Sequence, residues 1–193
     1  MVRSVILIAA AIQLSQPGMS AKQAKGYATV VQQEAKKRHF DPFSLVAIIH
    51  FESWWKSNAI SPSGEDYGLS QIRMRFVGAC RKDADPVNNP SKACKAVKAS
   101  LLSPIYNIRY ASAHITRSRA FCRKKVGRAT YHGWLAAWQG SHKRGKWCRK
   151  NKHTTLRIKY RGKLVKLANQ GRLKLRNKAK PKKKRVAKRR PKR

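Results

Sequence analysis

The chain has 193 residues, of which 46 are Lys or Arg and only 7 are Asp or Glu, so its formal net charge is +39. Without a short leader and a basic tail, roughly 130 to 150 residues remain, which is the usual size of one domain. All seven acids lie between Glu34 and Asp85, which excludes carboxylate chemistry from the last 108 residues. The excess positive charge indicates a polyanionic partner or surface.

The first 20 residues have the pattern of a secretory signal peptide. Arg3 supplies a positive charge, residues 5–14 are a short apolar run, and small residues follow it. We expect cleavage near Ser20 or Ala21. An uncleaved membrane anchor is the alternative, but ten or so apolar residues fall short of the ~20 that span a bilayer. We therefore expect an exported protein, periplasmic or extracellular, with no transmembrane segment in the mature chain.

The four cysteines are expected to form two disulfides, because thiols in exported proteins are usually oxidised. They are Cys80, Cys94, Cys122 and Cys148. Three pairings are possible. We favour the pairing of sequence neighbours because it closes the shorter loops.

The predicted elements begin with a helix over residues 21–39, where the apolar positions have helical spacing. Asp41-Pro42 then gives a helix start, with Asp as the N-cap and Pro as the first helical residue. This second helix should run to about Ser53, and its nearly all-apolar interior predicts that it is buried at the centre of the domain. Residues 58–68 contain Pro, Gly, Ser and Asn and predict a loop or short hairpin.

Two more helices are predicted over residues 91–117, with a break near Ser103-Pro104, and over residues 130–140. Beyond residue 147 the chain is rich in Lys and Arg with scattered Leu, and its last part cannot bury enough apolar surface to fold alone. We therefore expect one α+β, predominantly helical domain over residues 22–150. A basic, largely disordered extension over residues 151–193 should follow it.

One glutamate lies inside the apolar pattern of the second helix. Leu45, Ile48, Ile49 and Glu52 fall at i, i+3, i+4 and i+7 and share one face. Burial disfavours the ionised carboxyl and raises its pKa, so Glu52 could hold a proton near neutral pH and donate it to a leaving oxygen. The alternative is that Glu52 ends its helix and points to water.

The residues after Glu52 favour the first interpretation. Glu52-Ser53 on a helix, followed by Gly-Leu-Ser-Gln-Ile over residues 68–72, resembles the fingerprint of the lytic transglycosylase family of the lysozyme superfamily. Asn107-Ile108 with a later alanine is similar to the family's Asn-Ile-x-x-Gly-Ala helix, although Tyr110 replaces the glycine. The resemblance implies a lysozyme-like fold.

A further segment, Ala-Ala-Trp-Gln-Gly over residues 136–140, resembles the family's Ala-Ala-Tyr-Asn-Ala-Gly, with Trp138 and Gln139 in place of tyrosine and asparagine. The resemblance covers roughly residues 24 to 140. It implies that Ser53 and Gln71 position the substrate or the glutamate. It also implies a substrate groove lined by Tyr67, Trp138 and Gln139.

The resemblance implies a reaction with a single carboxylate. Glu52 would protonate the glycosidic oxygen between N-acetylmuramic acid and N-acetylglucosamine in peptidoglycan. The ionised Glu52 would then take the proton of the muramic 6-hydroxyl, and a 1,6-anhydro ring would close. We expect no cofactor and no metal, because no metal-binding or nucleotide-binding motif occurs and the six histidines are scattered.

Two alternatives remain open. Glu65 and Asp66 follow closely, and glycoside hydrolases commonly use two carboxylates. Asp66-Tyr67-Gly68 also resembles the Asp-Tyr-Gly of animal-type lysozymes, so a hydrolytic lysozyme using Glu52 and Asp66 is possible; otherwise Asp66 is a loop residue offsetting nearby arginines. The other alternative is a cationic protein that binds nucleic acid or the cell envelope through an inert lysozyme-like core.

We expect the basic tail to bind anionic envelope polymers or lipids. Lys and Arg clusters bind phosphate backbones without sequence preference. However, the tail has no interleaved aromatic residues on which bases could stack. Nucleic acid is therefore not the expected partner.

Overall fold

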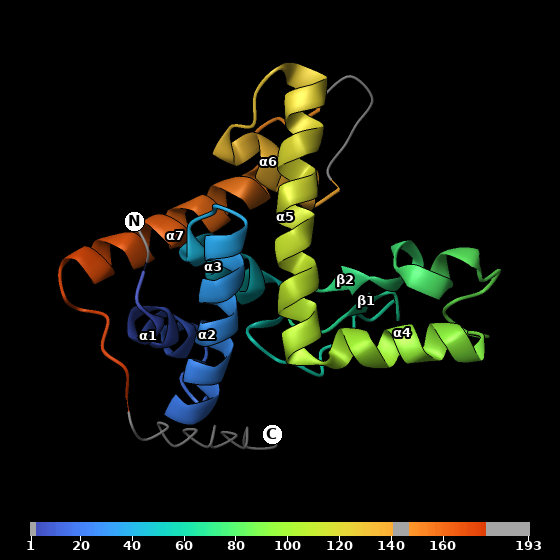
Figure 1. The fold of residues 1–193 in the computed structure, drawn as a ribbon, viewed down its shortest axis with the longest axis horizontal. Coiled ribbons are helices and arrows are strands. Elements are labelled where there is room, and N and C mark those ends of the chain that lie inside the picture. The colour runs from blue at the N-terminus through green and yellow to red at the C-terminus, as the bar shows by residue number, and fades with distance from the viewer. Residues whose placement is uncertain (1–2, 141–146, 177–193) are drawn as a thin grey trace, which may run out of the picture.

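The computed structural model describes residues 3–140 and 147–176, and Figure 1 shows their arrangement. The elements in chain order are α1 (Val5–Ser15), α2 (Ala21–Lys37), α3 (Pro42–Ser53), β1 (Asp66–Tyr67), β2 (Ile72–Arg73), the 3-10 helices η1 (Met74–Phe76) and η2 (Gly78–Lys82), α4 (Lys92–Leu102), α5 (Pro104–Val126), α6 (Tyr131–Trp138) and α7 (Lys152–Asn169). The predicted helix-rich α+β class is confirmed.

Helix α3 is the buried centre of the fold and has the predicted bounds. The Asp41 carboxylate accepts a hydrogen bond from the backbone N–H of Phe43 at 3.3 Å, and Pro42 opens the helix. Such a start satisfies backbone donors that would otherwise lack partners. The side chains from Phe43 to Ile49 are buried, so α3 packs against neighbours on all sides. It ends where Trp54 enters the left-handed region at φ 53°.

Helices α1, α2 and α7 surround α3 in one lobe of the molecule (Figure 1). Helix α1 lies against both α2 and α3, with Ile8 and Ile12 fully buried. The segment predicted to be a signal peptide thus forms a helix that packs on the domain.

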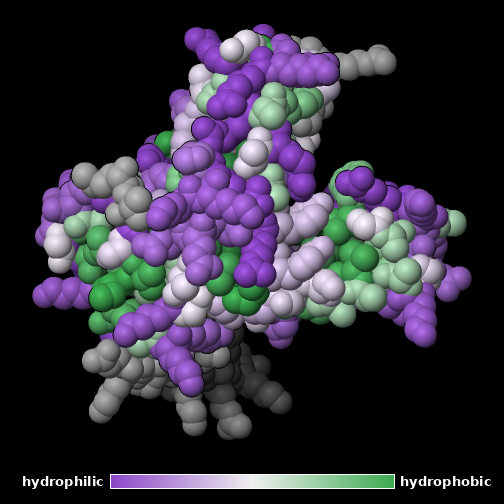
Figure 2. All heavy atoms as spheres, in the orientation of Figure 1, coloured by the Kyte–Doolittle hydropathy of each residue, from purple (hydrophilic) through white to green (hydrophobic). Residues whose placement is uncertain are grey.

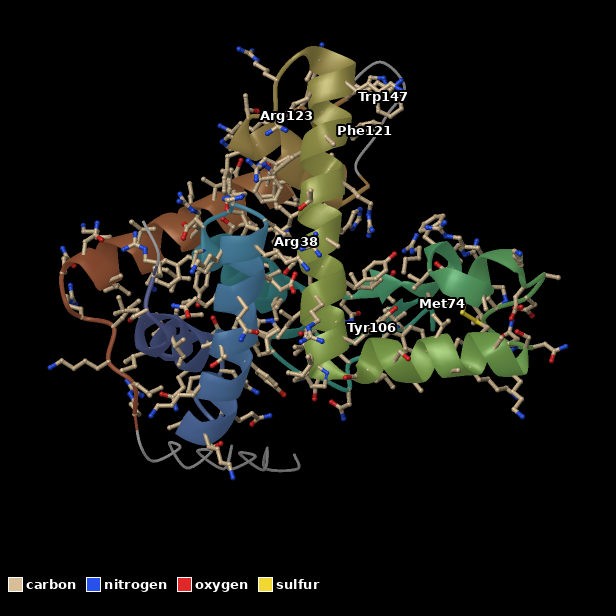
Figure 3. The ribbon with its side chains drawn as sticks, viewed as in Figure 1. Arg38, Met74, Tyr106, Phe121, Arg123 and Trp147 are labelled. Atoms are coloured by element: carbon tan, nitrogen blue, oxygen red, sulfur yellow. A yellow bond between two sulfur atoms is a disulfide. The ribbon has the colours of Figure 1, made fainter. Side chains whose placement is uncertain are left out.

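The long helix α5 separates this lobe from a smaller one that contains α4, the strands and the 3-10 helices (Figure 1). Strands β1 and β2 form an antiparallel hairpin in which Asp66 pairs with Arg73 and Tyr67 with Ile72. Met74 is fully buried inside this lobe, close to the disulfide between η2 and α4 (Figure 3). Figure 3 also shows Phe121 and Trp147 together at the far end of α5, with ring centroids 5.6 Å apart.

Both disulfides have the favoured pairing, Cys80 with Cys94 and Cys122 with Cys148. The first joins η2 to α4, and the second ties the end of α5 to the segment that leads into α7. The predicted break between α4 and α5 is also confirmed, since Ser103 ends one helix and begins the other. Helix α5 extends to Val126, beyond the predicted end near residue 117.

Part of the predicted basic extension, beyond residue 150, is helical and packs on the domain. The segment from residue 152 to 169 forms α7, which packs against α3 and α6. Asn151 and Thr154 form a reciprocal capping box at its start, which stabilises the first turn. Leu164 is fully buried. The disorder expected of residues 177–193 lies outside the described residues.

Hydrophilic side chains cover most of the face in Figure 2, with hydrophobic patches on both lobes. Within residues 3–140 and 147–176, no helix combines the length and the apolar character that crossing a membrane requires.

Candidate active site

Glu52 lies in the last turn of α3, on the side that borders a cavity of about 750 Å³. Its side chain is 20% exposed, so the carboxyl is mostly withdrawn from solvent but can still be reached from the cavity. The cavity is lined by Glu52, Asp66, Gln71, Ile72, Arg73, Phe76, Arg81, Tyr110, His114, Arg117, Ala137, Trp138, Gln139, Gly140 and Arg157. Both lobes and the intervening helix α5 therefore contribute to it.

The hairpin wall of the cavity is fastened to two helices by buried hydrogen bonds. The Ser53 hydroxyl donates to the Leu69 carbonyl at 2.7 Å. The Asn107 amide, from α5, donates to the Tyr67 carbonyl at 2.9 Å and accepts from the Ser70 N–H at 2.8 Å. These bonds fix residues 66–73 relative to Glu52.

Gly68 is required in this wall for a steric reason. Its φ is +74°, and a Cβ at this position would collide with the Leu101 carbonyl and the Asn107 side chain. Only glycine allows so close an approach at this backbone conformation. The family-like motif of residues 68–72 and Asn107 therefore form one packed unit.

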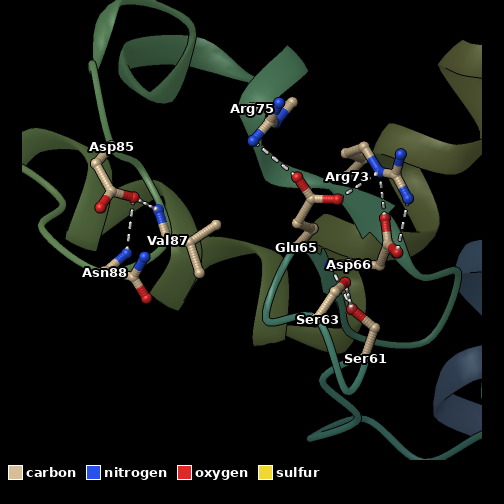
Figure 4. Close-up of polar contacts among 9 residues, drawn as sticks. All are labelled: Ser61, Ser63, Glu65, Asp66, Arg73, Arg75, Asp85, Val87 and Asn88. Atoms are coloured by element: carbon tan, nitrogen blue, oxygen red, sulfur yellow. Dashed lines mark hydrogen bonds and ion pairs between the residues drawn. The ribbon is translucent and has the colours of Figure 1, made fainter.

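Asp66 lines the same cavity but is already paired. Its two carboxylate oxygens accept from Arg73 Nε at 3.0 Å and Nη2 at 3.2 Å, across the hairpin (Figure 4). Glu65 pairs with Arg75 at 2.8 Å and, more weakly, with Arg73 Nε at 3.7 Å (Figure 4). The charges of both acids are therefore offset by arginines of the same segment.

The wall opposite the hairpin comes from α6 and α7. Arg157, on α7, reaches Glu52 with Nη2 at 2.5 Å from Oε1, and its side chain is only 7% exposed. With the Gln139 amide oriented so that its oxygen faces the guanidinium, that oxygen accepts from Nη1 at 2.9 Å and from Nη2 at 3.2 Å. Arg157, Glu52 and Gln139 thus form one polar cluster at the cavity wall.

Opposing effects act on the ionisation of Glu52. Burial raises its pKa above the ordinary value, and the negative charge of Asp66 acts in the same direction. The positive charge of Arg157 and its hydrogen bond lower the pKa, but burial is the largest effect and the net direction is upward. A carboxyl in this state can hold a proton nearer neutral pH than an exposed one.

His114, on α5, faces the cavity beside Trp138, with ring centroids 5.7 Å apart. Burial, with a smaller effect from Arg117, lowers the pKa of His114 to about 4. His114 is therefore neutral at physiological pH. Among the described residues, no group of three or more His, Cys, Asp or Glu side chains could hold a metal ion.

The predicted site residues divide into two sets. Gln71, Trp138 and Gln139 line the cavity together with Glu52. Ser53 and Tyr67 do not belong to the lining formed by the described residues. Ser53 is buried and holds the hairpin, and the Tyr67 ring is buried with the Lys98 ammonium 5.6 Å from its centroid.

Gln71 and Trp138 are both constrained by the fold. Gln71 has a left-handed backbone at φ 47°, and its Nε2 donates to the Gly68 carbonyl at 3.0 Å and the Ala59 carbonyl at 3.2 Å. The Trp138 indole N–H donates to the Ala111 carbonyl at 3.4 Å. Both side chains therefore offer the cavity a fixed surface.

Arg157 was missed by sequence reasoning, because it lies in the segment that was expected to be a disordered extension. A signal was present in the spacing. Arg157, Tyr160, Arg161 and Leu164 fall at i, i+3, i+4 and i+7, which is the spacing of one helical face. Because two of these four residues are arginines, the hydrophobic pattern does not predict a buried helical face.

A helix-rich fold with a half-buried glutamate at the end of its central helix, facing a cleft between two lobes, defines a lysozyme-like protein. Comparison with protein families matches residues 29–155 to the Transglycosylase SLT domain. The match covers more than half of the chain, so the protein belongs to this family, whose substrate is peptidoglycan. Searches of curated proteins and of solved structures found no match.

Proposed function

We propose that this protein is an exported lytic transglycosylase that cleaves the β-1,4 bond between N-acetylmuramic acid and N-acetylglucosamine. Glu52 is the catalytic residue, first as acid and then as base. The observation that carries the proposal is the position of the Glu52 carboxyl, mostly withdrawn from solvent yet bordering a cavity of about 750 Å³. Burial raises the pKa of this carboxyl, as a proton donor requires.

The reaction balances without water. Protonated Glu52 gives its proton to the glycosidic oxygen as the bond from that oxygen to C1 of muramic acid breaks. The Glu52 carboxylate then takes the proton of the muramic 6-hydroxyl, while the oxygen of that hydroxyl bonds to C1. The products are a free 4-hydroxyl and a 1,6-anhydro end, and Glu52 is protonated again.

The other lining residues have supporting roles in this proposal. Trp138 offers part of an indole face to a sugar ring, and the amides of Gln71 and Gln139 can orient hydroxyl and acetamido groups. Ser53 and Tyr67 act indirectly, through hydrogen bonds that hold residues 66–73 in place. We assign them to positioning of the groove and not to direct contact with substrate.

Mass spectrometry of digested, purified peptidoglycan tests the proposal directly. We expect soluble muropeptides with 1,6-anhydro ends from the wild-type protein and none from Glu52→Gln. Unchanged binding of Glu52→Gln to sacculi would separate loss of catalysis from loss of folding. If the wild-type protein binds sacculi but releases nothing at any pH or salt concentration, the cationic binding protein with an inert core is the better description.

Hydrolysis by Glu52 and Asp66 is the second candidate, favoured by one observation: both carboxyls line the same cavity, and the charge of Asp66 acts on Glu52. Products that carry an added water would establish it. Asp66→Asn gives a second test. A loss of activity as deep as that of Glu52→Gln supports two-carboxylate hydrolysis, whereas a loss below about tenfold supports a bystander paired with Arg73.

We further propose that residues 1–20 direct export and are then removed, and that the basic extension retains the enzyme on anionic envelope polymers or lipids. Since α7 packs on the domain, its exposed lysines and the residues beyond 176 would make that contact. Binding of this kind should weaken steeply with added salt. A salt-independent association with envelope fragments would argue against it.

A further inference from the structure

The cluster around Glu52 contains a residue from outside the family match. Arg157 lies just beyond the matched range of 29–155 and is separated from Glu52 by 105 positions in the sequence. It is nevertheless the nearest cation to the candidate catalytic carboxyl, at 2.5 Å. Helix α7 is therefore placed to act on the reaction.

We propose that Arg157 is a positioning residue for Glu52, holding the carboxylate and the Gln139 amide in one cluster and serving as the counter-charge of ionised Glu52 during the reaction. The inference rests on the proposed role of Glu52. It assigns to α7 a part in the site that the SLT match does not include.

The guanidinium suits this role because it has several donors in one plane. Nη2 reaches Glu52 and Gln139 together, while Nη1 reaches Gln139 and the backbone carbonyl of His153 at 3.2 Å. The face of Phe51 lies 5.4 Å from the guanidinium carbon and limits its movement. A lysine has one charged nitrogen and cannot hold two side chains in a fixed plane.

The anchoring of α7 keeps Arg157 at this place. Four residues further along, Arg161 pairs with Asp41 at 2.6 Å, just before the start of α3, and its guanidinium lies over the Tyr131 ring. Tyr160 stacks on His50 of α3 with ring centroids 4.1 Å apart. Helix α7 is thus fixed to both ends of the helix that carries Glu52.

The reaction explains why a counter-charge is useful here. When Glu52 gives up its proton, a negative charge forms on a carboxyl that is mostly withdrawn from water. A fixed cation at hydrogen-bonding distance stabilises that charge, and the barrier to proton donation falls. The same contact holds the carboxylate oriented for the return of a proton.

Other charged and titratable groups line the same cavity as Glu52. They are Asp66 and Arg73 of the hairpin, Arg81 of η2, and Tyr110, His114 and Arg117 of α5. Helices α1 and α2 add no titratable side chain to the lining within the part of the chain that the structure describes. Of these groups, Asp66 acts on the ionisation of Glu52, and it raises the pKa, whereas Arg157 lowers it.

Arg157→Met tests the proposal, with Arg161→Met as a matched control on the same helix. Removal of the Arg157 charge should raise the pKa of Glu52, so the alkaline limb of the pH profile of activity moves to higher pH. The maximal kcat should fall about tenfold or more, as part of the ~10²–10⁴-fold that a general acid contributes, with a smaller change in KM. Arg161→Met should lower stability and leave the alkaline limb unchanged.

Arg157→Lys completes the set, because it keeps the charge and loses the planar fork. Its alkaline limb should stay near the wild-type position, while kcat falls between those of the wild type and Arg157→Met. If Arg157→Met leaves the pH profile unmoved and loses only stability, the proposal is wrong. It is equally wrong if KM rises and kcat does not change, since Arg157 would then bind substrate directly.

A titration that does not depend on turnover separates this proposal from the proposed function. The carboxyl carbon of Glu52 can be followed by NMR in folded wild-type protein and in Arg157→Met. An upward shift of its pKa in the variant supports the contact even if no muropeptide is ever released. No shift in a folded variant overturns the inference and leaves the proposed function standing.

Discussion

Helices α1 and α7 lie on the same lobe and both pack against α3, yet they differ in what they give to the site. Helix α1 is apolar and contributes Ile8 and Ile12 to the core, but none of its described residues lines the cavity. Helix α7 is basic and places Arg157 on Glu52. Neither was expected to be part of the folded domain, and only one of them reaches the candidate chemistry.

This difference suggests that the leader can be removed without loss of the site, whereas the start of the basic extension cannot. A helix that supplies only apolar contacts can be replaced by solvent at a cost in stability. A helix that supplies the counter-charge of a half-buried carboxylate cannot, because the charge that remains is left without a partner. Breaking a buried ion pair in this way typically costs about 3–5 kcal/mol.

The largest difference is expected between two truncated chains, one without α7 and one without α1. A chain that ends after Lys150 lacks α7, so muropeptide release should fall by at least about 100-fold and unfolding should occur at a lower temperature. A chain that starts at Ala21 should keep activity within a few-fold. Assays of muropeptide release and thermal unfolding by circular dichroism would measure both changes.

A third chain, ending after Arg176, is the control for the loss of positive charge alone. It keeps α7 and should retain cleavage of soluble glycan fragments. If the chain that ends after Lys150 is as active on such fragments, α7 has no part in the site. In that case the contrast between the two helices disappears.

Next in size is the effect of removing one buried side chain from each helix. Leu164 and Ile12 are both fully buried. Replacing such a side chain by alanine should lower the free energy of unfolding by about 3 kcal/mol. Leu164→Ala should lower the free energy of unfolding of every form of the protein. Ile12→Ala should do so only while residues 1–20 remain attached.

Urea unfolding of the full chain and of exported, purified protein would measure these two effects. Mass spectrometry of the exported protein would identify its first residue. An exported protein that starts at Met1 and loses stability in Ile12→Ala would contradict removal of the leader. Helix α1 would then be a permanent part of the domain.

Helices α3 and α7 indicate how much of the fold can be predicted from the sequence. Helix α3 was predicted with its correct bounds, because Asp41-Pro42 is a strong local start signal and the apolar run is continuous. Glu52 could be proposed because its surroundings on the helix face are also local. Both disulfides followed from the shortest loops.

The contacts of α7 could not be found in this way. Its inward face carries Arg157, Tyr160, Arg161 and Leu164 in that order. The hydrophobic period is therefore interrupted by two charges whose partners lie in α3 and just before it. Local composition treats such charges as solvated. Only the fold reveals that two of the chain's seven acids, Asp41 and Glu52, are their partners.

A pH scan of stability tests the α5 side of the cavity, to which neither α1 nor α7 belongs. His114 has a pKa of about 4 in the fold because of burial, against 6.5 when unfolded. The unfolded chain therefore takes up a proton as pH falls below 6.5, while the folded chain does so only near 4. Stability contributed by neutral His114 is complete above pH 6.5 and is lost toward pH 4, at about 3 kcal/mol in all.

His114→Gln should flatten this acid slope, as measured by urea unfolding at pH 7, 5.5 and 4. His153→Gln is the control, because His153 lies on α7 and is exposed. An equal slope in wild type and His114→Gln would place the acid sensitivity elsewhere. If the slope is flattened in His153→Gln instead, the acid sensitivity of stability comes from α7.

The smallest effect is expected at the hydrogen bond that joins the two helices. The hydroxyl groups of Ser15 and Tyr160 are 2.7 Å apart, and the ring of Tyr160 also stacks on His50. Tyr160→Phe keeps the stacking and removes only the hydroxyl, so the full chain should lose about 1 kcal/mol of unfolding free energy. A chain that starts at Ala21 has no Ser15 and should lose nothing. Equal losses in the two chains would mean that the Tyr160 hydroxyl stabilises α7 without α1, and that its hydrogen bond to Ser15 adds nothing to stability.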